Sequence, residues 1–245
     1  MGGGMSGWLR TEVQGFFDLL FPPACAFCQT TLSLKTQSPF CESCTQGIRP
    51  LPSGRCPRCA LPFVASDSSS HLCAECSRTL PPFLSVHSAG LYEAGLRELV
   101  HRFKFEQGHY LDRGLAQLMH RVLDPVVNPD IIIPVPLHNL RLRQRTYNQS
   151  LLLARELAGR LARPVSYCLL ERVRNTRQQQ GLRAVERAQN LRGAFLCRSQ
   201  LDGEKILLVD DVMTTGATAA ACSRVLLDAG ASEVRVVVAG RAGRS

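Results

Sequence analysis

From Phe83 onward, short uninterrupted hydrophobic runs alternate with longer segments of helical period. Such runs indicate strands that are covered on both faces, and apolar positions three and four apart indicate amphipathic helices. The pattern predicts strands at residues 85–92, 131–135, 165–169, 206–209 and 234–239, and helices at residues 94–103, 111–122, 149–162 and 215–229. This alternation favours an α/β fold with a mostly parallel sheet flanked by helices, and makes the first strand a candidate for antiparallel pairing at the edge.

The first 80 residues follow a different pattern. One face of a short amphipathic helix is marked by Trp8, Val13, Phe16, Phe17 and Leu20. The stretch that follows has few large apolar residues and is bounded by two proline pairs. We therefore expect three parts: an N-terminal segment with a short amphipathic helix at residues 1–22, a small module at 23–80, and the α/β domain at 81–245.

Cysteine spacing explains how the small module folds. Eight of the 11 cysteines form four Cys-x-x-Cys pairs: Cys25/Cys28, Cys41/Cys44, Cys56/Cys59 and Cys73/Cys76. Each pair places two thiolates on one turn, and two turns complete a four-thiolate site that is closed to substrate, which is typical of structural zinc. The 12 and 13 residues between the paired turns suit a hairpin, so the pattern predicts two successive zinc ribbons.

Two alternatives stay open at this stage. One is a disulfide framework, which belongs to an oxidising compartment, and the other is an interleaved arrangement in which the first pair joins the third. With so few large apolar side chains, the metal has to supply much of the module's stability. The other cysteines, Cys168, Cys197 and Cys222, lie among apolar residues and are expected to be buried small hydrophobes.

The segment ILLVDDVMTTGAT, residues 206–218, has the most informative chemistry. Asp210 and Asp211 follow a buried strand, and open α/β sheets bind ligands at the carboxyl ends of their strands. The next residues offer backbone N–H groups, hydroxyls and a flexible backbone at a helix start, which suits a phosphate. These phosphate candidates are Thr214, Thr215, Gly216 and Thr218.

Carboxylates beside a phosphate site would repel the phosphate itself. We therefore assign Asp210 and Asp211 to the hydroxyls of a sugar or to a magnesium shell. An alternative is an ordinary helix N-cap, in which Thr214 or Thr215 satisfies unpaired amides. Capping needs only one such residue, whereas this loop combines three threonines, two carboxylates and a glycine. The segment therefore favours a sugar phosphate.

The net charge of +9 is uneven, because residues 141–192 contain 12 arginines and three glutamates. Three of these arginines follow the loop PVPLH, which leaves another core strand, and arginine grips a diphosphate with its planar fork. The candidates for the pyrophosphate end of a ligand are Lys104, Arg141, Arg143 and Arg145. The alternatives are a solvated basic face and, for Lys104, a favourable charge at a helix end.

The polar segment at residues 172–182 shows neither strand nor helix period, and basic residues continue after it. Three interpretations fit: a loop that closes over a ligand, a contact for nucleic-acid phosphates, or an ordinary exposed loop. The candidate residues are Arg172, Arg174, Arg177, Arg183, Arg187 and Arg192.

Nothing in the sequence indicates export or membrane insertion. The N-terminus lacks a basic segment followed by an apolar stretch and a small-residue cleavage site. No run reaches the roughly 18 apolar residues that a membrane helix needs. We therefore expect a cytoplasmic protein.

The order of motifs is specific: FPPACAFC, CPRCALP, HRFKF, PVPLHNLRLRQRTYNQ, RAVERAQNLRGAF and LLVDDVMTTGAT. Over roughly residues 8–240 the chain resembles the ComF/GntX family of competence-associated proteins, a double zinc ribbon joined to a type I phosphoribosyltransferase domain. The resemblance implies that Asp210 and Asp211 contact the ribose of phosphoribosyl pyrophosphate (PRPP), and that the threonine loop wraps its 5′-phosphate. It also implies Mg²⁺ bound with PRPP.

Membership of that family implies handling of single-stranded DNA during natural transformation, with a helicase-like competence protein as a possible partner. Two alternatives stay open: a metabolic phosphoribosyltransferase for a small nitrogenous acceptor, and a PRPP-sensing interaction protein without catalysis. Whether the chain is an enzyme is therefore open. The resemblance does not identify an acceptor, because Thr146, Tyr147 and residues 177–180 differ from the common pattern in loops near the ligand.

Overall fold

The computed structural model describes residues 22–33, 36, 38–63, 70–106, 108–138, 140, 142–143, 146–174 and 190–243. The chain forms two compact units, Met1–Gly47 and Ile48–Ser245. The first cysteine ribbon therefore belongs to the smaller unit, and the second ribbon belongs to the larger one. The expected boundaries at residues 22 and 80 stay predictions, and the expected N-terminal helix lies outside the described residues.

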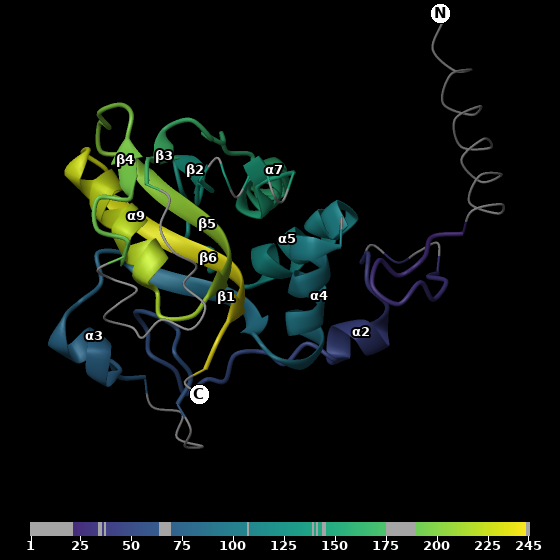
Figure 1. The fold of residues 1–245 in the computed structure, drawn as a ribbon. Helices are drawn as coiled ribbons and strands as arrows, with labels where there is room; N and C mark the ends of the chain where they lie inside the picture. The colour runs from purple at the N-terminus through teal and green to yellow at the C-terminus, as the bar shows by residue number, and fades with distance from the viewer. Residues whose placement is uncertain are drawn as a thin grey trace, which may run out of the picture. The chain divides into compact units, whose positions relative to one another are not determined.

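The larger unit is built on a four-stranded parallel sheet of order β1-β6-β5-β2 (Figure 1). Its strands are β1 Ser85–Leu91, β2 Ile131–Pro134, β5 Lys205–Met213 and β6 Glu233–Arg241. The expected antiparallel pairing of the first strand is wrong, because Val86 lies opposite Val236 in a parallel register. The chain leaves β1 through helices and not through a hairpin, which permits parallel strands.

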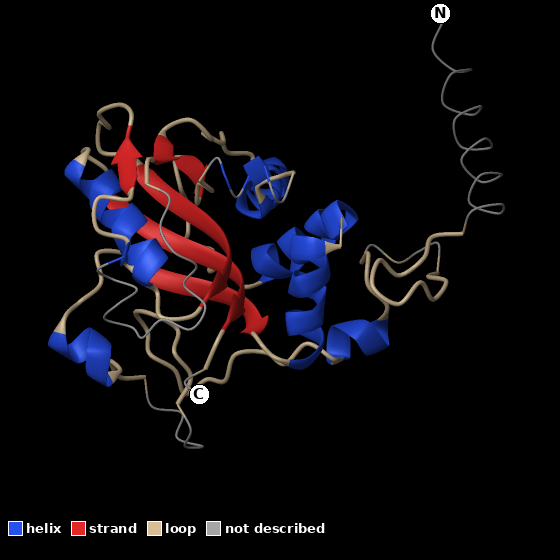
Figure 2. Cartoon of the chain, in the orientation of Figure 1, coloured by secondary structure: helices blue, strands red, loops and turns tan. Residues whose placement is uncertain are grey.

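Among the described residues, four helices flank the sheet, each within two residues of its predicted bounds: α4 Ala94–Phe105, α5 Asp112–Arg121, α7 Gln149–Leu161 and α9 Ala217–Asp228. A 3₁₀ turn, η1 Gly108–Leu111, joins α4 to α5. Helix α9 covers one face, and α4, α5 and α7 cover the other (Figure 2). The mostly parallel α/β fold is therefore confirmed.

The segment after α7 differs from the prediction. Residue Val165 makes only an isolated parallel bridge to Ile132, and the strand begins later, as β3 Leu170–Arg172. Strand β3 pairs antiparallel with β4 Phe195–Cys197 in a separate two-stranded sheet. The apolar residues run on through Leu170, so the hydrophobic pattern could not locate the start of pairing. Cys168 is exposed and Cys197 half-buried, so only Cys222 is the buried cysteine that we expected.

Both ribbons use the same turn around their first cysteine pair. In the first, the Gln29 amide donates to the Cys25 carbonyl at 2.9 Å, and in the second the Ala60 amide donates to the Cys56 carbonyl at 2.9 Å. Gln29 and Ala60 take positive φ angles of 64° and 55°, a conformation that glycine adopts most easily. The later pairs lead into short helices, α2 Glu42–Gln46 and α3 Ala74–Arg78.

The second ribbon is part of the hydrophobic core of the larger unit. All four of its cysteines are buried and belong to the same cluster as Phe83, Leu208 and Val236. Cys222 and Leu226 of α9 are in that cluster too. The ribbon and the α9 face of the sheet are therefore packed as one body. None of the described helices combines the length and the apolar character needed to cross a bilayer.

Candidate functional site

The two acidic residues lie inside strand β5 and not beyond its end. The strand was predicted to stop at Val209, but it continues to Met213, with Asp210 opposite Val238 and Val212 opposite Gly240. Backbone pairing with β6 continues although the side chains have become polar, because the ladder uses only main-chain groups. Both carboxylates are therefore fixed to a rigid strand near its carboxyl end.

Asp210 lies in a desolvated setting, although part of its side chain reaches solvent. Its Oδ1 accepts hydrogen bonds from the Ser150 hydroxyl at 3.0 Å and from the Asp211 amide at 2.9 Å. Burial, and after it the nearby Asp211 carboxylate, raise the pKa of Asp210 from 3.8 to about 7, with Lys104 opposing both. Asp210 can therefore change its protonation state near neutral pH.

Asp211 is paired with Lys104, which comes from the last turn of α4. The Lys104 Nζ lies 2.9 Å from Asp211 Oδ1, and only 16% of the lysine side chain and 12% of the aspartate side chain are exposed. Residues more than 40 positions later in the chain hold the backbone at Lys104. Tyr147 donates to the Phe103 carbonyl, and Gln149 donates to the Lys104 carbonyl at 3.5 Å. The motifs HRFKF and TYNQ therefore meet beside the carboxylates.

The start of α7 connects this lysine side of the site to Asp210. Asn148 is the N-cap of α7, and its Oδ1 accepts from the Ser150 amide at 3.0 Å. Its Nδ2 donates to the Val135 carbonyl, 3.1 Å away, just after β2. The capping residue thus places Ser150 so that its hydroxyl reaches Asp210. The residue that follows β2 is thus held beside the start of α7.

The threonine loop follows β5 and opens α9. Gly216 is the N-cap residue with φ of 83°, and a Cβ added there would lie 2.5 Å from Met213 Cε. Only glycine fits this position without strain. The Thr215 hydroxyl accepts from the Ala217 amide at 3.4 Å, so the capping alternative describes Thr215. It does not account for the carboxylates or for the other two threonines.

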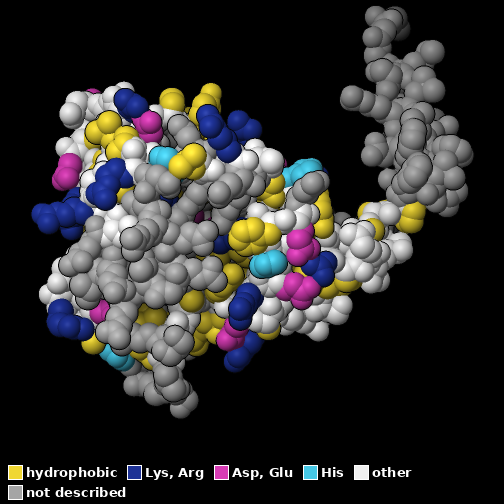
Figure 3. Space-filling model, in the orientation of Figure 1, with side chains coloured by type: hydrophobic (Ala, Val, Ile, Leu, Met, Phe, Trp, Pro, Cys, Tyr) yellow, Lys and Arg dark blue, Asp and Glu magenta, His cyan; other side chains and the backbone are white. Residues whose placement is uncertain are grey.

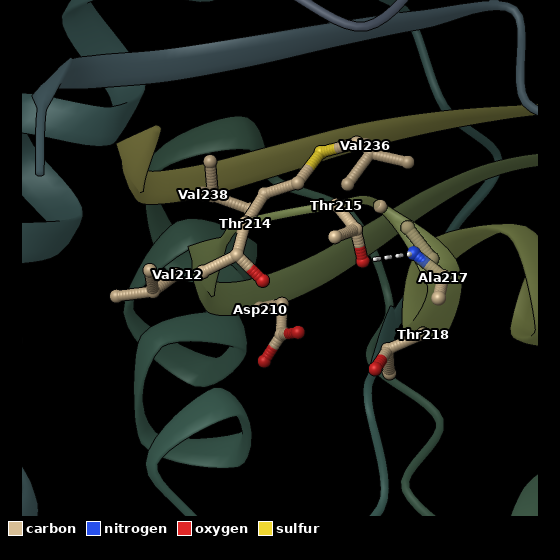
Figure 4. Close-up of a pocket in the computed structure, with 11 residues that line it drawn as sticks. Asp210, Val212, Thr214, Thr215, Ala217, Thr218, Val236 and Val238 are labelled. Carbon is tan, nitrogen blue, oxygen red and sulfur yellow. Dashed lines mark hydrogen bonds between the residues drawn. The ribbon is translucent and has the colours of Figure 1, made fainter. Parts of the chain in front are cut away.

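A hollow lies between this loop and the end of β5. Figure 4 shows the oxygen atoms of Asp210, Thr214, Thr215 and Thr218 around one open space. Val236 and Val238 of β6 also line it. Its volume is about 40 Å³, and since one water occupies roughly 10–15 Å³ on this measure, it has room for about three waters. That is the size of a phosphate group and not of a whole sugar phosphate.

Arg241, which the sequence analysis missed, lies behind the threonine loop. It is the last residue of β6 and only 2% exposed. Its Nε donates to the Cys59 carbonyl at 2.8 Å, and its Nη1 donates to the carbonyls of Met213 at 3.3 Å, Ala242 at 2.6 Å and Thr214. Its Nη2 lies 3.9 Å from Cys59 Sγ. No local motif could have identified it, because its partners Cys59, Met213 and Thr214 are distant in sequence.

The remaining arginine candidates are only partly brought to the site. Arg143 is exposed. Arg172 was expected in a loop but lies buried in β3, with its guanidinium carbon 5.5 Å from the centroid of the Phe195 ring. Arg174 donates to the Arg192 carbonyl, and both side chains are exposed. Most of the polar segment lies outside the described residues, and so do five candidates: Arg141, Arg145, Arg177, Arg183 and Arg187.

The cysteine pairs assemble in sequential order. The sulfurs of the first four lie within 4.8 Å of one another, and so do those of the second four, so the interleaved alternative is wrong. Cys28 and Cys41 sulfurs are 3.6 Å apart, and those of Cys59 and Cys73 are 3.7 Å apart. A zinc ion with Zn–S bonds of about 2.3 Å sets tetrahedral S–S edges of about 3.8 Å, whereas a disulfide needs about 2.05 Å. Both sets therefore fit structural zinc.

The raised pKa of Asp210 gives a testable dependence of stability on pH. Its folded-state pKa of about 7 lies above the ordinary value of 3.8. At pH values between the two, the folded protein binds more protons than the unfolded chain, so the unfolding free energy falls as pH rises. We expect Asp210→Asn to remove this fall, which is up to about 4 kcal/mol by pH 8. Melting temperatures of the two proteins, measured from pH 5 to 8, will diverge with the variant higher at pH 8.

The exposed Asp228→Asn change on α9 is the matched control and leaves the wild-type curve unchanged. Any loss of zinc at acid pH affects all three proteins alike, so the difference between wild type and variant reports the carboxyl alone. Parallel curves for wild type and Asp210→Asn would show that the carboxyl titrates normally.

Comparisons with known proteins agree with this organisation. The family described as a double zinc ribbon domain matches residues 16–77, and the phosphoribosyl transferase domain matches residues 148–244. Competence protein F of Haemophilus influenzae is 32% identical over 223 residues, which cover 86% of this chain and 94% of that protein. The DNA utilization protein YhgH of Salmonella typhi is 34% identical over 224 residues, covering 89% and 96%.

A more distant relative extends the comparison. Competence protein ComFC of Bacillus subtilis is 28% identical over 212 residues, which cover 80% of this chain and 81% of that protein. The matches thus span both the cysteine ribbons and the parallel sheet with its threonine loop. The chain belongs to the ComF/GntX family, in which a double zinc ribbon precedes a domain of the phosphoribosyltransferase type.

Proposed function

We propose that this protein binds PRPP with Mg²⁺ at the carboxyl end of β5, and acts in the cytosol on single-stranded DNA during natural transformation. The single observation that supports the ligand is the meeting of two chemistries at one strand end. Asp210 and Asp211 provide acceptors for sugar hydroxyls, and the loop at residues 214–218 provides hydroxyls and a helix start for a phosphate.

In this proposal the 5′-phosphate occupies the hollow, whose volume of about 40 Å³ suits that group. The ribose then extends over the edge of the hollow toward the carboxylates. Lys104 lies 2.9 Å from Asp211, on the side where the pyrophosphate would follow, with Arg143 and the undescribed Arg141 and Arg145 as further candidates. Placing the phosphate in the threonine loop keeps it away from the acidic pair.

Charge explains why Mg²⁺ belongs in the proposal. Two ionised aspartates and Lys104 sum to a net charge of −1, which would repel a polyanionic ligand. A divalent cation reverses that sign, and carboxylate and phosphate oxygens are its preferred ligands. Asp210 and Asp211 would hold the cation, which would offset the negative charge of the ligand. The chain's own part is to hold Asp210 through Ser150 and Asp211 through Lys104.

The action on DNA is supported by the names of the relatives and by charge. The match with this chain covers 94% of competence protein F and 96% of DNA utilization protein YhgH. The chain carries a net charge of +9, and arginine suits nucleic-acid phosphates. On the face drawn in Figure 3, the described basic side chains are spread out and do not form one patch. The proposed contact is therefore the arginine-rich part of the sequence that Arg174 and Arg192 flank, with a helicase-like protein as a further partner.

The DNA proposal predicts salt-dependent binding through these arginines. Replacing Arg174 and Arg192 together by alanine is expected to weaken binding of an oligothymidine strand by about 10- to 25-fold at 0.1 M salt, since each phosphate contact contributes about fivefold there. The slope of log affinity against log salt falls by about 1.4. Fluorescence anisotropy across a salt series measures both quantities.

The control replaces two exposed arginines elsewhere, Arg97 and Arg121, and leaves affinity and slope within twofold of wild type. If the control and the Arg174/Arg192 variant behaved alike, the arginine segment would not be the nucleic-acid contact.

Transfer of the phosphoribosyl group is a second candidate, favoured by the pKa of Asp210 near 7, which is where acid–base groups are effective. In that reaction a nitrogen acceptor attacks the anomeric carbon and pyrophosphate leaves, with its charge stabilised by Lys104 and the arginines. Pyrophosphate release that depends on one acceptor would establish this function. Ligand binding without release, across nitrogenous acceptors, would favour a PRPP sensor.

A further inference from the structure

Arg241 joins the threonine loop to the second zinc ribbon within the larger unit. Four carbonyl oxygens accept from its guanidinium: two belong to Met213 and Thr214 at the loop, one belongs to Cys59 in the ribbon, and one belongs to Ala242 beside it. The Met213 carbonyl also accepts from the Ala242 amide at 2.9 Å. One buried side chain thus holds the backbone of both elements.

The positive charge of this guanidinium is compensated at the metal site. Among the described residues, none of the ion pairs includes Arg241, although it is only 2% exposed. A buried charge needs compensation. Four thiolates around Zn²⁺ carry a net charge of −2, and Arg241 Nη2 lies 3.9 Å from Cys59 Sγ. The zinc-bound ribbon therefore supplies the negative charge that keeps the arginine in place.

The contacts also fix the direction of two peptide groups at the ligand site. A trans peptide is planar, so its N–H points opposite to its C=O. Because the carbonyls of Met213 and Thr214 face Arg241, the amides of Thr214 and Thr215 point away from it. Oriented backbone amides in a loop before a helix form the concave anion site that a phosphate needs. Without the guanidinium, these peptides lose the contact that sets their orientation.

We propose that Arg241 is a positioning residue that couples the second zinc site to the phosphate loop. It holds the loop in its ligand-binding form, and zinc in the ribbon holds Arg241. This inference rests on the proposed binding of PRPP. Coupling between two sites is reciprocal, so zinc strengthens PRPP binding and PRPP retains zinc in the second ribbon.

The effect of PRPP on zinc binding in the second ribbon can be measured without changing Arg241. In a protein whose first site is removed by Cys28→Ser/Cys41→Ser, only the second site holds zinc. Transfer of this zinc to a coloured chelator is measured at equilibrium over a chelator series, with and without PRPP and Mg²⁺. We expect PRPP to raise the zinc affinity of the second site about tenfold. Equal zinc affinities at saturating PRPP would overturn the coupling.

The variant Arg241→Lys tests the arginine itself. Lysine keeps the charge but cannot donate to four carbonyls in a fixed fork. On a background with both zinc ions bound, we expect PRPP binding to weaken at least tenfold and its protection of zinc to disappear. Arg235→Lys is the matched control, because Arg235 is also on β6 but pairs with Glu233. The control retains wild-type affinity and protection.

The outcomes separate this inference from the proposed function. If the wild type fails to bind PRPP, the proposed function fails, yet a lower zinc affinity of Arg241→Lys than of wild type without ligand would still support the link from Arg241 to Cys59. If PRPP binds to wild type and Arg241→Lys equally well, with equal protection of zinc, the coupling is refuted while the proposed function stands.

Discussion

Replacing Asp210 and Asp211 together by asparagine is expected to weaken binding of PRPP with Mg²⁺ by about 10²- to 10⁴-fold. Each carboxylate is assigned a hydrogen bond from a ribose hydroxyl or a place beside the cation, and hydrogen bonds to charged groups contribute about 1.5–3 kcal/mol each. The double change also removes both negative charges that would attract Mg²⁺ and leaves Lys104 without its partner at 2.9 Å. Calorimetric titration of the folded variant measures the loss.

Folding and binding are separated by the stability of the variant. Asn in place of Asp210 removes a desolvated carboxyl whose pKa is raised to about 7, so this position does not lower the melting temperature at pH 8. The Asp228→Asn control changes an exposed acid at the end of α9, the helix that the threonine loop opens, and keeps wild-type affinity. A double variant that bound PRPP within threefold of wild type would remove the acidic pair from the site.

Loss of the second zinc is expected to destabilise the larger unit far more than loss of the first. Cys56 and Cys73 are buried in the same cluster as Phe83, Leu208 and Cys222, and structural zinc provides folding free energy on the order of 10 kcal/mol. We expect Cys56→Ser/Cys73→Ser to lower the melting temperature of this unit by roughly 10–20 °C, which corresponds to about 5 kcal/mol. Differential scanning calorimetry with zinc analysis measures both effects.

The matched control is Cys25→Ser/Cys41→Ser, which removes the first site from the smaller unit. Each variant retains one zinc per chain, but the control leaves the transition of the larger unit within about 2 °C of wild type. Equal destabilisation by the two variants would mean that the second ribbon contributes nothing special to the core.

Local pattern was sufficient for most of the architecture. Helices α4, α5, α7 and α9 repeat apolar residues at helical spacing and were located within two residues, because one buried stripe determines each of them. The cysteine pairs were predicted correctly because four Cys-x-x-Cys turns carry their own chemistry. Position at the carboxyl end of a buried strand similarly identified Asp210 and Asp211 as candidates.

Features that depend on distant partners were not accessible from pattern. The end of β5 was placed at Val209, since pairing of Asp210 with Val238 of β6 is invisible in the β5 sequence. Arg172 was assigned to a loop because the antiparallel partner of β3 is 20 or more residues away along the chain. Arg241 gave no signal at all, because its partners Cys59 and Thr214 are brought to it only by the fold.

The association of the second ribbon with the sheet is another tertiary effect. Composition alone predicted one small module at residues 23–80. The structure divides the chain at Gly47 and Ile48, which leaves the second ribbon with the larger unit. Cys59 is buried beside Arg241, which also donates to the Thr214 carbonyl of the threonine loop, and no sequence motif predicts these contacts.

Calorimetric titration of the wild-type protein with PRPP tests the central claim most directly. With both zinc ions bound and Mg²⁺ present, we predict saturable binding of one PRPP per chain, weakened when Mg²⁺ is omitted and competed by ribose 5-phosphate. A folded, zinc-loaded protein that takes up no PRPP at millimolar ligand would contradict the assignment of the site at the end of β5.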